Sequence, residues 1–131
     1  MDDLKPSRHE RRFRRIPQNL SADLRLLGLN TSTDIPIRGV LTDMGAAGVH
    51  ILLGSAYHRG TRFEVVVSLN GEIVTFCAMV RHVRWYSSTP GMTFGHGMQI
   101  TEIEEESLLA IVRYVTDEMS KVSRGLGIAV A

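Results

Sequence analysis

Residues 62–85 of the sequence, RFEVVVSLNGEIVTFCAMVRHVRW, decide the fold more than any other stretch. In their first part every second residue is apolar, which is the period of a strand with one buried face. Asn70 and Gly71 follow, and this pair favours a two-residue hairpin turn because both positions take positive φ. A second strand-forming run, 72–85, begins directly after the turn. The stretch therefore predicts an antiparallel hairpin with an inward set of Phe63, Val65, Val67 and Leu69.

Short segments of the same kind, separated by turn signals, flank the hairpin on both sides. We expect further strands at residues 23–29, 37–43, 49–53 and 94–101. With the hairpin they make six strands, and many short strands at this spacing are typical of an all-β sandwich or barrel.

A single helix is expected near the C-terminus, where apolar residues recur at helical spacing over about four turns. Acidic residues 104–106 suit the positive end of its dipole, and Gly125 is a plausible stop. We expect this helix to cover the outer side of the strand at 73–83, which is apolar on both faces in its first half. The periodic residues are Leu108, Ile111, Val112, Val115, Met119 and Val122.

Length and composition limit the class of protein. The 131 residues fit one domain, which we divide into an arginine-rich arm (1–20), a barrel with its helix (21–124) and a tail (125–131). With 44% apolar and 22% charged residues the chain is not disordered, and no apolar run reaches the ~20 residues of a membrane span. The first residues lack a cationic region followed by an apolar one, so we expect no export, and the only cysteine, Cys77, cannot form an internal disulfide. These features favour the cytoplasm.

Charge is concentrated in two places although the net charge is only +1. Residues 8–15 hold five arginines and one acid, whereas residues 102–118 hold six acids and one base. The arm reads ERRFRRIP over 10–17, and a second unusual segment, DMGAAG, spans 43–48 between two expected strands. Guanidinium groups pair with phosphate oxygens and with the O6 and N7 acceptors of guanine. Asp43 can accept hydrogen bonds from the N1–H and the amine of guanine, so a guanine-containing anion would use both segments.

At these residues the sequence resembles the PilZ family, bacterial receptors for the second messenger cyclic di-GMP. The family motif is R-x-x-x-R in the arm, followed by [DN]-x-S-x-x-G at the turn between the second and third strands of a six-stranded antiparallel barrel. Arg11 and Arg15 match the first motif, and Asp43 and Gly48 match the ends of the second. Gly45 stands where the family has serine. The resemblance spans roughly residues 8–120 and implies an all-β, six-stranded PilZ-type barrel with a C-terminal α-helix packed on it.

The resemblance also implies a function and a site. The protein is expected to be a bacterial cyclic di-GMP receptor without enzymatic activity, in which ligand binding orders the N-terminal arm and an effector protein reads the change. The expected ligand-binding residues are Arg11, Arg12, Arg15, Asp43, Gly45 and Gly48. No metal or cofactor is expected, because the five histidines lack metal-ligand spacing and are better explained as surface or hydrogen-bonded strand residues.

Two other functions stay open at this stage. A degenerate family member could have lost nucleotide binding and act only as a protein-interaction module, which the missing serine favours. Nucleic-acid binding by the arm is disfavoured by the pI of about 8.0 and the few exposed aromatic residues expected. The number of nucleotides bound, the effector, the process controlled and the oligomeric state do not follow from the sequence.

Overall fold

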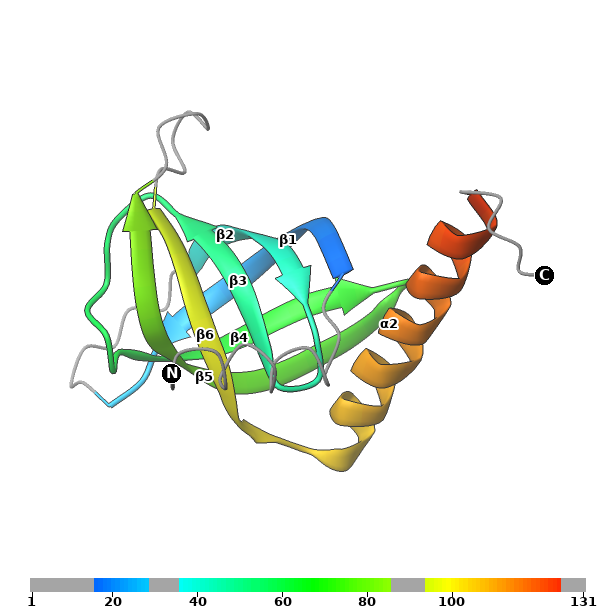
Figure 1. Ribbon diagram of the computed structural model, residues 1–131. Helices are drawn as coiled ribbons and strands as arrows, with labels where there is room; N and C mark the ends of the chain where they lie inside the picture. Colours follow the sequence, from blue (N-terminus) through cyan, green and yellow to red (C-terminus); the bar gives the residue numbers. More distant parts are fainter. Residues whose placement is uncertain (1–15, 29–35, 86–93, 126–131) are drawn as a thin grey trace, which may run out of the picture.

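The computed structural model describes residues 16–28, 36–85 and 94–125, and they form a closed antiparallel barrel with one helix (Figure 1). Around the barrel the strands follow the order β1-β2-β3-β6-β5-β4. This confirms the predicted fold class. The elements are β1 (Ile16–Leu26), β2 (Ile37–Met44), β3 (Gly48–Leu53), β4 (Arg62–Leu69), β5 (Glu72–Trp85), β6 (Phe94–Ile103) and α2 (Glu105–Gly125).

The β4–β5 hairpin forms as its sequence predicts. Leu69 pairs with Glu72, which leaves Asn70 and Gly71 as the two turn residues. Their φ angles are 53° and 87°, so both positions take the left-handed conformation that this dipeptide favours. The alternation in β4 is equally regular, because the four predicted inward side chains are all buried in the barrel. Local turn chemistry and strand period therefore fix the register of this hairpin.

The first strand begins earlier than the sequence predicts. The arm was expected to reach residue 20 and the strand to begin at Asp23, whereas β1 starts at Ile16. Residues 17–19, Pro-Gln-Asn, carry no strand period, and proline lacks the N–H that a ladder uses. The register of β1 against β2 shifts between Pro17 and Leu20, and such an irregularity is how a strand accommodates proline.

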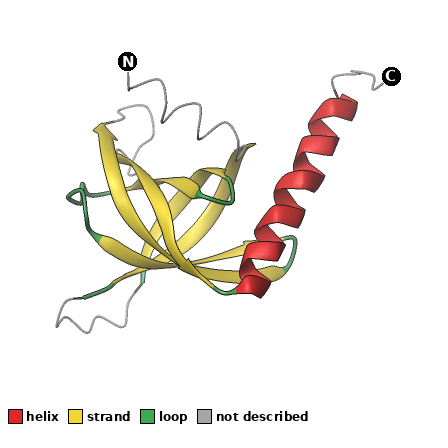
Figure 2. Cartoon of the chain, turned by 60° about the horizontal axis from the view of Figure 1, so that its bottom comes forward, coloured by secondary structure: helices red, strands yellow, loops and turns green. Residues whose placement is uncertain are grey.

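The helix packs on the core at one end of the barrel, and Figure 2 shows it beside the sheet as a separate rod. Four of its side chains join the same buried cluster as the barrel interior: Ala110, Ile111, Tyr114 and Val115. Its strand contacts are with β1, β4 and β5. The expectation that it covers the outer side of β5 is wrong at Ile73, which stays 66% exposed, because α2 directs its apolar stripe toward the barrel interior.

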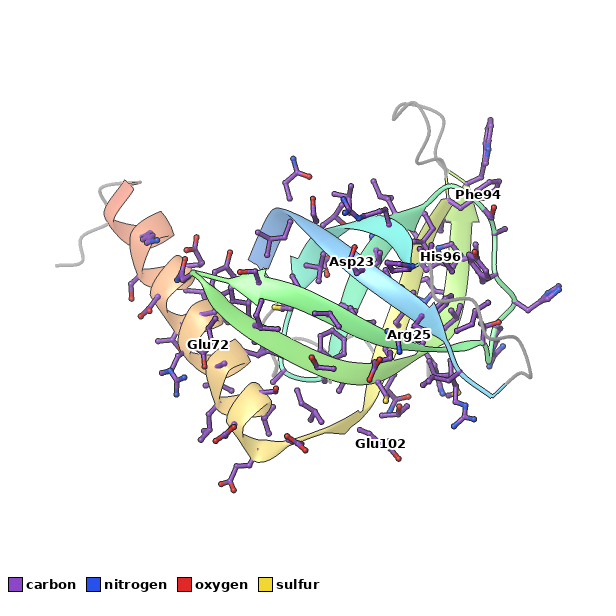
Figure 3. All side chains as sticks on the ribbon, turned by 180° about the vertical axis from the view of Figure 1, so that it is seen from behind. Asp23, Arg25, Glu72, Phe94, His96 and Glu102 are labelled. Atoms are coloured by element: carbon purple, nitrogen blue, oxygen red, sulfur yellow. The ribbon has the colours of Figure 1, made fainter. Side chains whose placement is uncertain are left out.

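The end of the barrel that carries α2 also holds three other features of the chain. The start of β1, the turn between β2 and β3 and the tip of the β4–β5 hairpin all lie at this end, since neighbouring strands are antiparallel. Arg113 of the helix contacts Glu72 at 3.4 Å, beside that hairpin tip. Figure 3 shows Glu72 near the helix, while Phe94 and His96 lie toward the opposite end. No helix in the described part of the chain is long and apolar enough to cross a membrane.

His96 is a polar side chain with no exposed surface, and its two ring nitrogens are both hydrogen-bonded. The backbone N–H of Tyr57 donates to Nε2 at 3.0 Å, so Nδ1 carries the proton and donates to the carbonyl of Phe94 at 3.2 Å. The bond from Tyr57 requires an unprotonated Nε2 and therefore the neutral imidazole. Burial, the largest influence, lowers the pKa of His96 from its ordinary value.

We expect this histidine to make the protein less stable in mild acid. The unfolded chain binds a proton at His96 below about pH 6.5, and the folded chain does so only at lower pH. The free energy of unfolding should therefore fall as the pH drops from about 6.5, by at most about 1.4 kcal/mol per pH unit for this group. Chemical denaturation at pH 7.0, 6.0 and 5.5 measures it. His96→Asn should flatten this dependence, whereas His58→Asn, at an exposed loop histidine, should preserve it. Equal slopes in the wild type and His96→Asn would contradict the assignment.

Candidate functional site

The backbone brings the arm and the Asp43 segment together. Ile16 pairs with Met44 and Pro17 pairs with Asp43 across the β1–β2 ladder. Arg15 directly precedes Ile16 in the chain, so the arm joins the barrel next to the Asp43 turn. The two segments are almost 30 residues apart in the sequence and become neighbours only through this pairing.

The turn between β2 and β3 is held in a defined shape by backbone hydrogen bonds. Within the turn, the N–H of Gly45 donates to the carbonyl of Gly48 at 3.0 Å. The carbonyl of Ala47 accepts a bond of 3.0 Å from the N–H of Ile100 on β6. The turn is therefore attached to β6 as well as to its own two strands.

Gly48 is required by the close approach of β6. It pairs with Gln99, and a Cβ atom at Gly48 would stand 2.7 Å from the backbone oxygen of Met98. That separation is shorter than real Cβ contacts, and a backbone oxygen in a ladder has little freedom to move. Gly48 thus lets β3 and β6 meet directly beside Asp43.

A bulge in β2 lies next to Asp43. Leu41 pairs with Ile51 and Asp43 with His50, which leaves Thr42 as the extra residue. Its hydroxyl donates to the carbonyl of His50 at 3.2 Å and lies 2.8 Å from Nδ1 of the same histidine. Bulges re-aim side chains and are common beside binding sites. The side chain of Thr42 thus ties the bulge to β3, one residue before Asp43.

On the outer surface of the sheet, beside the turn, β6 has a glycine, Gly97, and so no side chain at that position. Gly97 pairs with His50 on one side and with His82 on the other. A Cβ atom at Gly97 would collide with the imidazole of His82, so that ring lies across the glycine. Alternating glycines at 95 and 97 indicate a close approach, but the ring that lies over Gly97, that of His82, follows only from the three-dimensional pairing.

Three of the six predicted ligand residues fall in this turn and three fall outside the described structure. Asp43 and Gly48 are half-buried and Gly45 is buried. Arg11, Arg12 and Arg15 lie outside the described residues. Asp43 and Gly48 stand at the two ends of a single turn, and the register places the chain just after Arg15 against it.

The described part of the chain gives little indication of a metal site or of a reactive cysteine. No three His, Cys, Asp or Glu side chains gather there in a group able to hold a metal ion. Burial, followed by the charge of Glu102, raises the pKa of the Cys77 thiol. A thiol with a raised pKa is a poor nucleophile near neutral pH.

Comparison with known proteins shows where this fold occurs. The model of the PilZ domain family matches residues 9–117. No curated protein matches the chain. Among solved structures, the PilZ domain of YcgR from Escherichia coli with c-di-GMP is 14% identical, with a TM-score of 0.65, covering 90% of this chain and 98% of that one.

Two longer proteins share the fold as well. The inhibitor of motility MotI/DgrA of Bacillus subtilis is 15% identical, with a TM-score of 0.67 over 83% of this chain and 50% of its own. PlzA of Borreliella burgdorferi, solved in complex with c-di-GMP, is 14% identical, with a TM-score of 0.53 over 86% of this chain and 44% of its own. The chain thus spans about half the length of each of these two proteins.

The family match covers most of the chain, and the closed six-stranded barrel with its C-terminal helix matches the fold of a solved PilZ domain. The chain belongs to the PilZ domain family.

Proposed function

We propose that this protein is a bacterial, cytoplasmic receptor for cyclic di-GMP and performs no chemistry on it. The ligand would lie between the N-terminal arm and the turn at residues 43–48. The observation that carries this proposal is the pairing of Pro17 with Asp43, because it joins the arginine-rich arm to the barrel beside the turn that holds this carboxylate. Solved relatives that hold c-di-GMP add support, since YcgR and PlzA share the fold.

Each group in the proposed site has a distinct task. The guanidinium groups of Arg11, Arg12 and Arg15 would pair with the two phosphates of the ligand, and their flat faces can also stack on a purine. The carboxylate of Asp43 would accept from the N1–H and amine of guanine, which no other base presents together. Gly48 lets β3 lie close against β6 at the end of the same turn.

Binding would act as a switch on the arm. Fixing the backbone of a residue costs about 1–2 kcal/mol in conformational entropy, so the arm would settle against the barrel only when new contacts offset that cost. Two phosphate charges supply such contacts, at ~1.5–3 kcal/mol for each charge-assisted bond. An effector protein would then read the new position of the arm.

Thermal unfolding with and without cyclic di-GMP tests the proposal. A ligand that binds only the native state raises its stability by RT ln(1 + [L]/Kd), or about 2.7 kcal/mol at a hundredfold excess over Kd. We expect the midpoint to rise with micromolar cyclic di-GMP and to stay constant with GMP, which has one phosphate and one base. An unchanged midpoint with millimolar cyclic di-GMP would refute nucleotide binding.

Replacing Gly45 by serine should tighten binding, because it restores the hydroxyl of the family motif. A neutral hydrogen bond contributes ~0.5–1.5 kcal/mol, so we expect up to about a tenfold lower Kd by isothermal titration. The backbone permits the change, since Gly45 is not among the described glycines with positive φ. Gly45→Ala is the matched control, which adds the carbon without the oxygen and should give no gain. Equal affinities for Gly45→Ser and Gly45→Ala would contradict a role for the hydroxyl.

A second candidate function is a PilZ module that binds only protein. It is favoured by Gly45, which removes one polar group from the motif. In that case neither the wild type nor Gly45→Ser would respond to cyclic di-GMP in the thermal experiment. A response restricted to Gly45→Ser would identify a chain that lost its ligand through this single position.

A further inference from the structure

The end of the barrel away from α2 is formed largely by segments without acidic residues. Residues 44–63 and 73–101 contain no aspartate and no glutamate. They supply all of β3, the start of β4, and most of β5 and β6. In Figure 1 the end of β5 and the start of β6 stand together at the end of the barrel away from α2. The acidic residues of 102–118, by contrast, lie in α2 and just before it.

Three exposed arginines stand in these acid-free segments: Arg59, Arg81 and Arg84, which we name the basic rim. The backbone of residues 60–61 forms two hydrogen bonds of 2.8 Å with the N–H and the carbonyl of Val80. Arg59 and Arg81 are the next residues on these two segments, so they are neighbours. Arg84 follows on β5, on the same outer surface of the barrel. The basic rim thus concentrates three guanidinium groups around the end of one strand.

The charge of the basic rim is not neutralised by the described part of the chain. Two other exposed arginines of the barrel have acidic partners, since Arg25 lies 3.9 Å from Glu64 and Arg38 lies 2.8 Å from Asp23. No arginine of the basic rim forms an ion pair with a carboxylate of the described residues. These three guanidinium groups are therefore available to an anion from outside the chain.

An exposed tryptophan stands directly beside the basic rim. Trp85 follows Arg84 at the end of β5 and is 70% exposed. It is the only aromatic residue among the exposed large apolar side chains of the described residues, and the others lie at the α2 end: Ile73, Leu109 and Val112. Tryptophan gathers where lipid headgroups meet water, because its ring is apolar and its N–H is polar.

We propose that the basic rim and Trp85 form a docking surface for a membrane that contains anionic phospholipids. The guanidinium groups pair with the phosphates of the headgroups, and the indole ring enters the boundary between headgroups and acyl chains. A membrane presents charge of one sign, so it is matched by a surface without acids, whereas a protein partner presents both signs around an apolar interface core. Single-stranded nucleic acid is bound through several stacking aromatic residues, and this end of the described barrel exposes one.

Docking of this kind is weak and reversible. One basic residue near an anionic lipid surface strengthens binding by roughly fivefold, so three arginines contribute about a hundredfold. The tryptophan is the second signal that peripheral membrane binding requires in addition to charge. The α2 end, with the turn at residues 43–48, faces away from the membrane in this arrangement. Docking therefore does not depend on nucleotide binding.

Tryptophan fluorescence of the whole protein tests the docking surface, because Trp85 is the only tryptophan of the chain. The protein is titrated with vesicles of about 30% phosphatidylglycerol in phosphatidylcholine, up to about 5 mM lipid. We expect the emission maximum to move to shorter wavelength, and to return in about 1 M salt, where the Debye length is only ~3 Å. Vesicles of phosphatidylcholine alone should have no effect. An unchanged maximum with the anionic vesicles would overturn the proposal.

Sedimentation of the protein with the same vesicles tests which residues bind. The double variant Arg81→Gln, Arg84→Gln should bind about 25-fold more weakly, at roughly fivefold for each arginine. The matched control is Arg113→Gln, Lys121→Gln, which removes the same charge from exposed positions of α2 and should change binding by less than about twofold. Trp85→Ala should weaken binding several-fold. Equal losses in the two double variants would show that only the net charge matters and would contradict the proposed surface.

Two soluble polyanions distinguish a membrane from the other possible partners. Polyuridylate represents single-stranded nucleic acid, and polyglutamate represents an acidic protein segment. We expect neither to shift the emission of Trp85 at charge concentrations where the anionic vesicles do. A shift with one of these polymers and none with vesicles would assign the surface to that class of partner and overturn the lipid proposal.

Discussion

Replacing Arg15 by alanine should weaken cyclic di-GMP binding by roughly 10- to 150-fold. That range corresponds to the ~1.5–3 kcal/mol of one charge-assisted hydrogen-bond contact to a phosphate. Arg15 is the motif arginine nearest to the barrel, because the next residue, Ile16, already pairs with Met44. Arg15→Lys should recover only part of the loss, since an ammonium group cannot form the two parallel bonds of a guanidinium.

Isothermal titration of three variants makes this prediction specific. Arg25→Ala is the matched control, because Arg25 is an exposed arginine near the other end of β1, paired with β4 and 3.9 Å from Glu64. Its removal should change the Kd by less than about twofold, as exposed ion pairs contribute little. If Arg15→Ala and Arg25→Ala bind with the same affinity as the wild type, the arm takes no part in the site.

Replacing Gly48 by alanine should damage both the fold and the site. The new Cβ would stand 2.7 Å from the backbone oxygen of Met98, so β3 and β6 must separate locally. Overpacking of this kind typically costs about 1–3 kcal/mol, or roughly 3–12 °C in the unfolding midpoint of a domain this size. The affinity for cyclic di-GMP should fall by more than about tenfold, because the turn that carries Asp43 is attached to β6 through Ile100.

The effect of Gly48→Ala on stability can be separated from its effect on ligand binding. Ser68→Ala, at an exposed position of β4, should stay within ~0.5 kcal/mol of the wild type in unfolding experiments. Binding should be measured well below the lowered midpoint, so that the folded fraction is the same in both proteins. A Gly48→Ala protein with wild-type stability would show that the strands do not meet as closely as described.

The central hairpin could be predicted from the sequence because its signals are local. The alternation in residues 62–69 sets the buried face, and Asn70-Gly71 sets the turn. The start of β1 could not be predicted in the same way. Pro17 and its polar neighbours lack a strand pattern, and they become a strand only because β2 offers a partner.

In the candidate site, too, local contacts could be predicted from the sequence and long-range contacts could not. Asp43, Gly45 and Gly48 share one turn, so their proximity follows from the sequence alone. That the arm joins the barrel beside this turn depends on the pairing of Pro17 with Asp43, a long-range contact. The need for glycine at 48 comes from Met98, fifty residues later, which no local pattern reveals.

The buried histidine shows what sequence patterns omit. His96 is one of five histidines with no distinguishing neighbours in the sequence. The two ring nitrogens form hydrogen bonds with the backbone N–H of Tyr57, which lies 39 residues earlier, and with the carbonyl of Phe94. Only a complete hydrogen-bond network can show that a polar ring is stable inside a barrel.

The most direct test of the proposed site is an NMR titration of the isotope-labelled protein with cyclic di-GMP. If the arm and the turn hold the ligand between them, the amide signals of residues 8–16 and of residues 43–48 should shift together and saturate at the same ligand concentration. The amides of the β4–β5 hairpin tip, such as Asn70, should stay where they are. Shifts at the turn without shifts in the arm, or no shifts at millimolar ligand, would contradict the account.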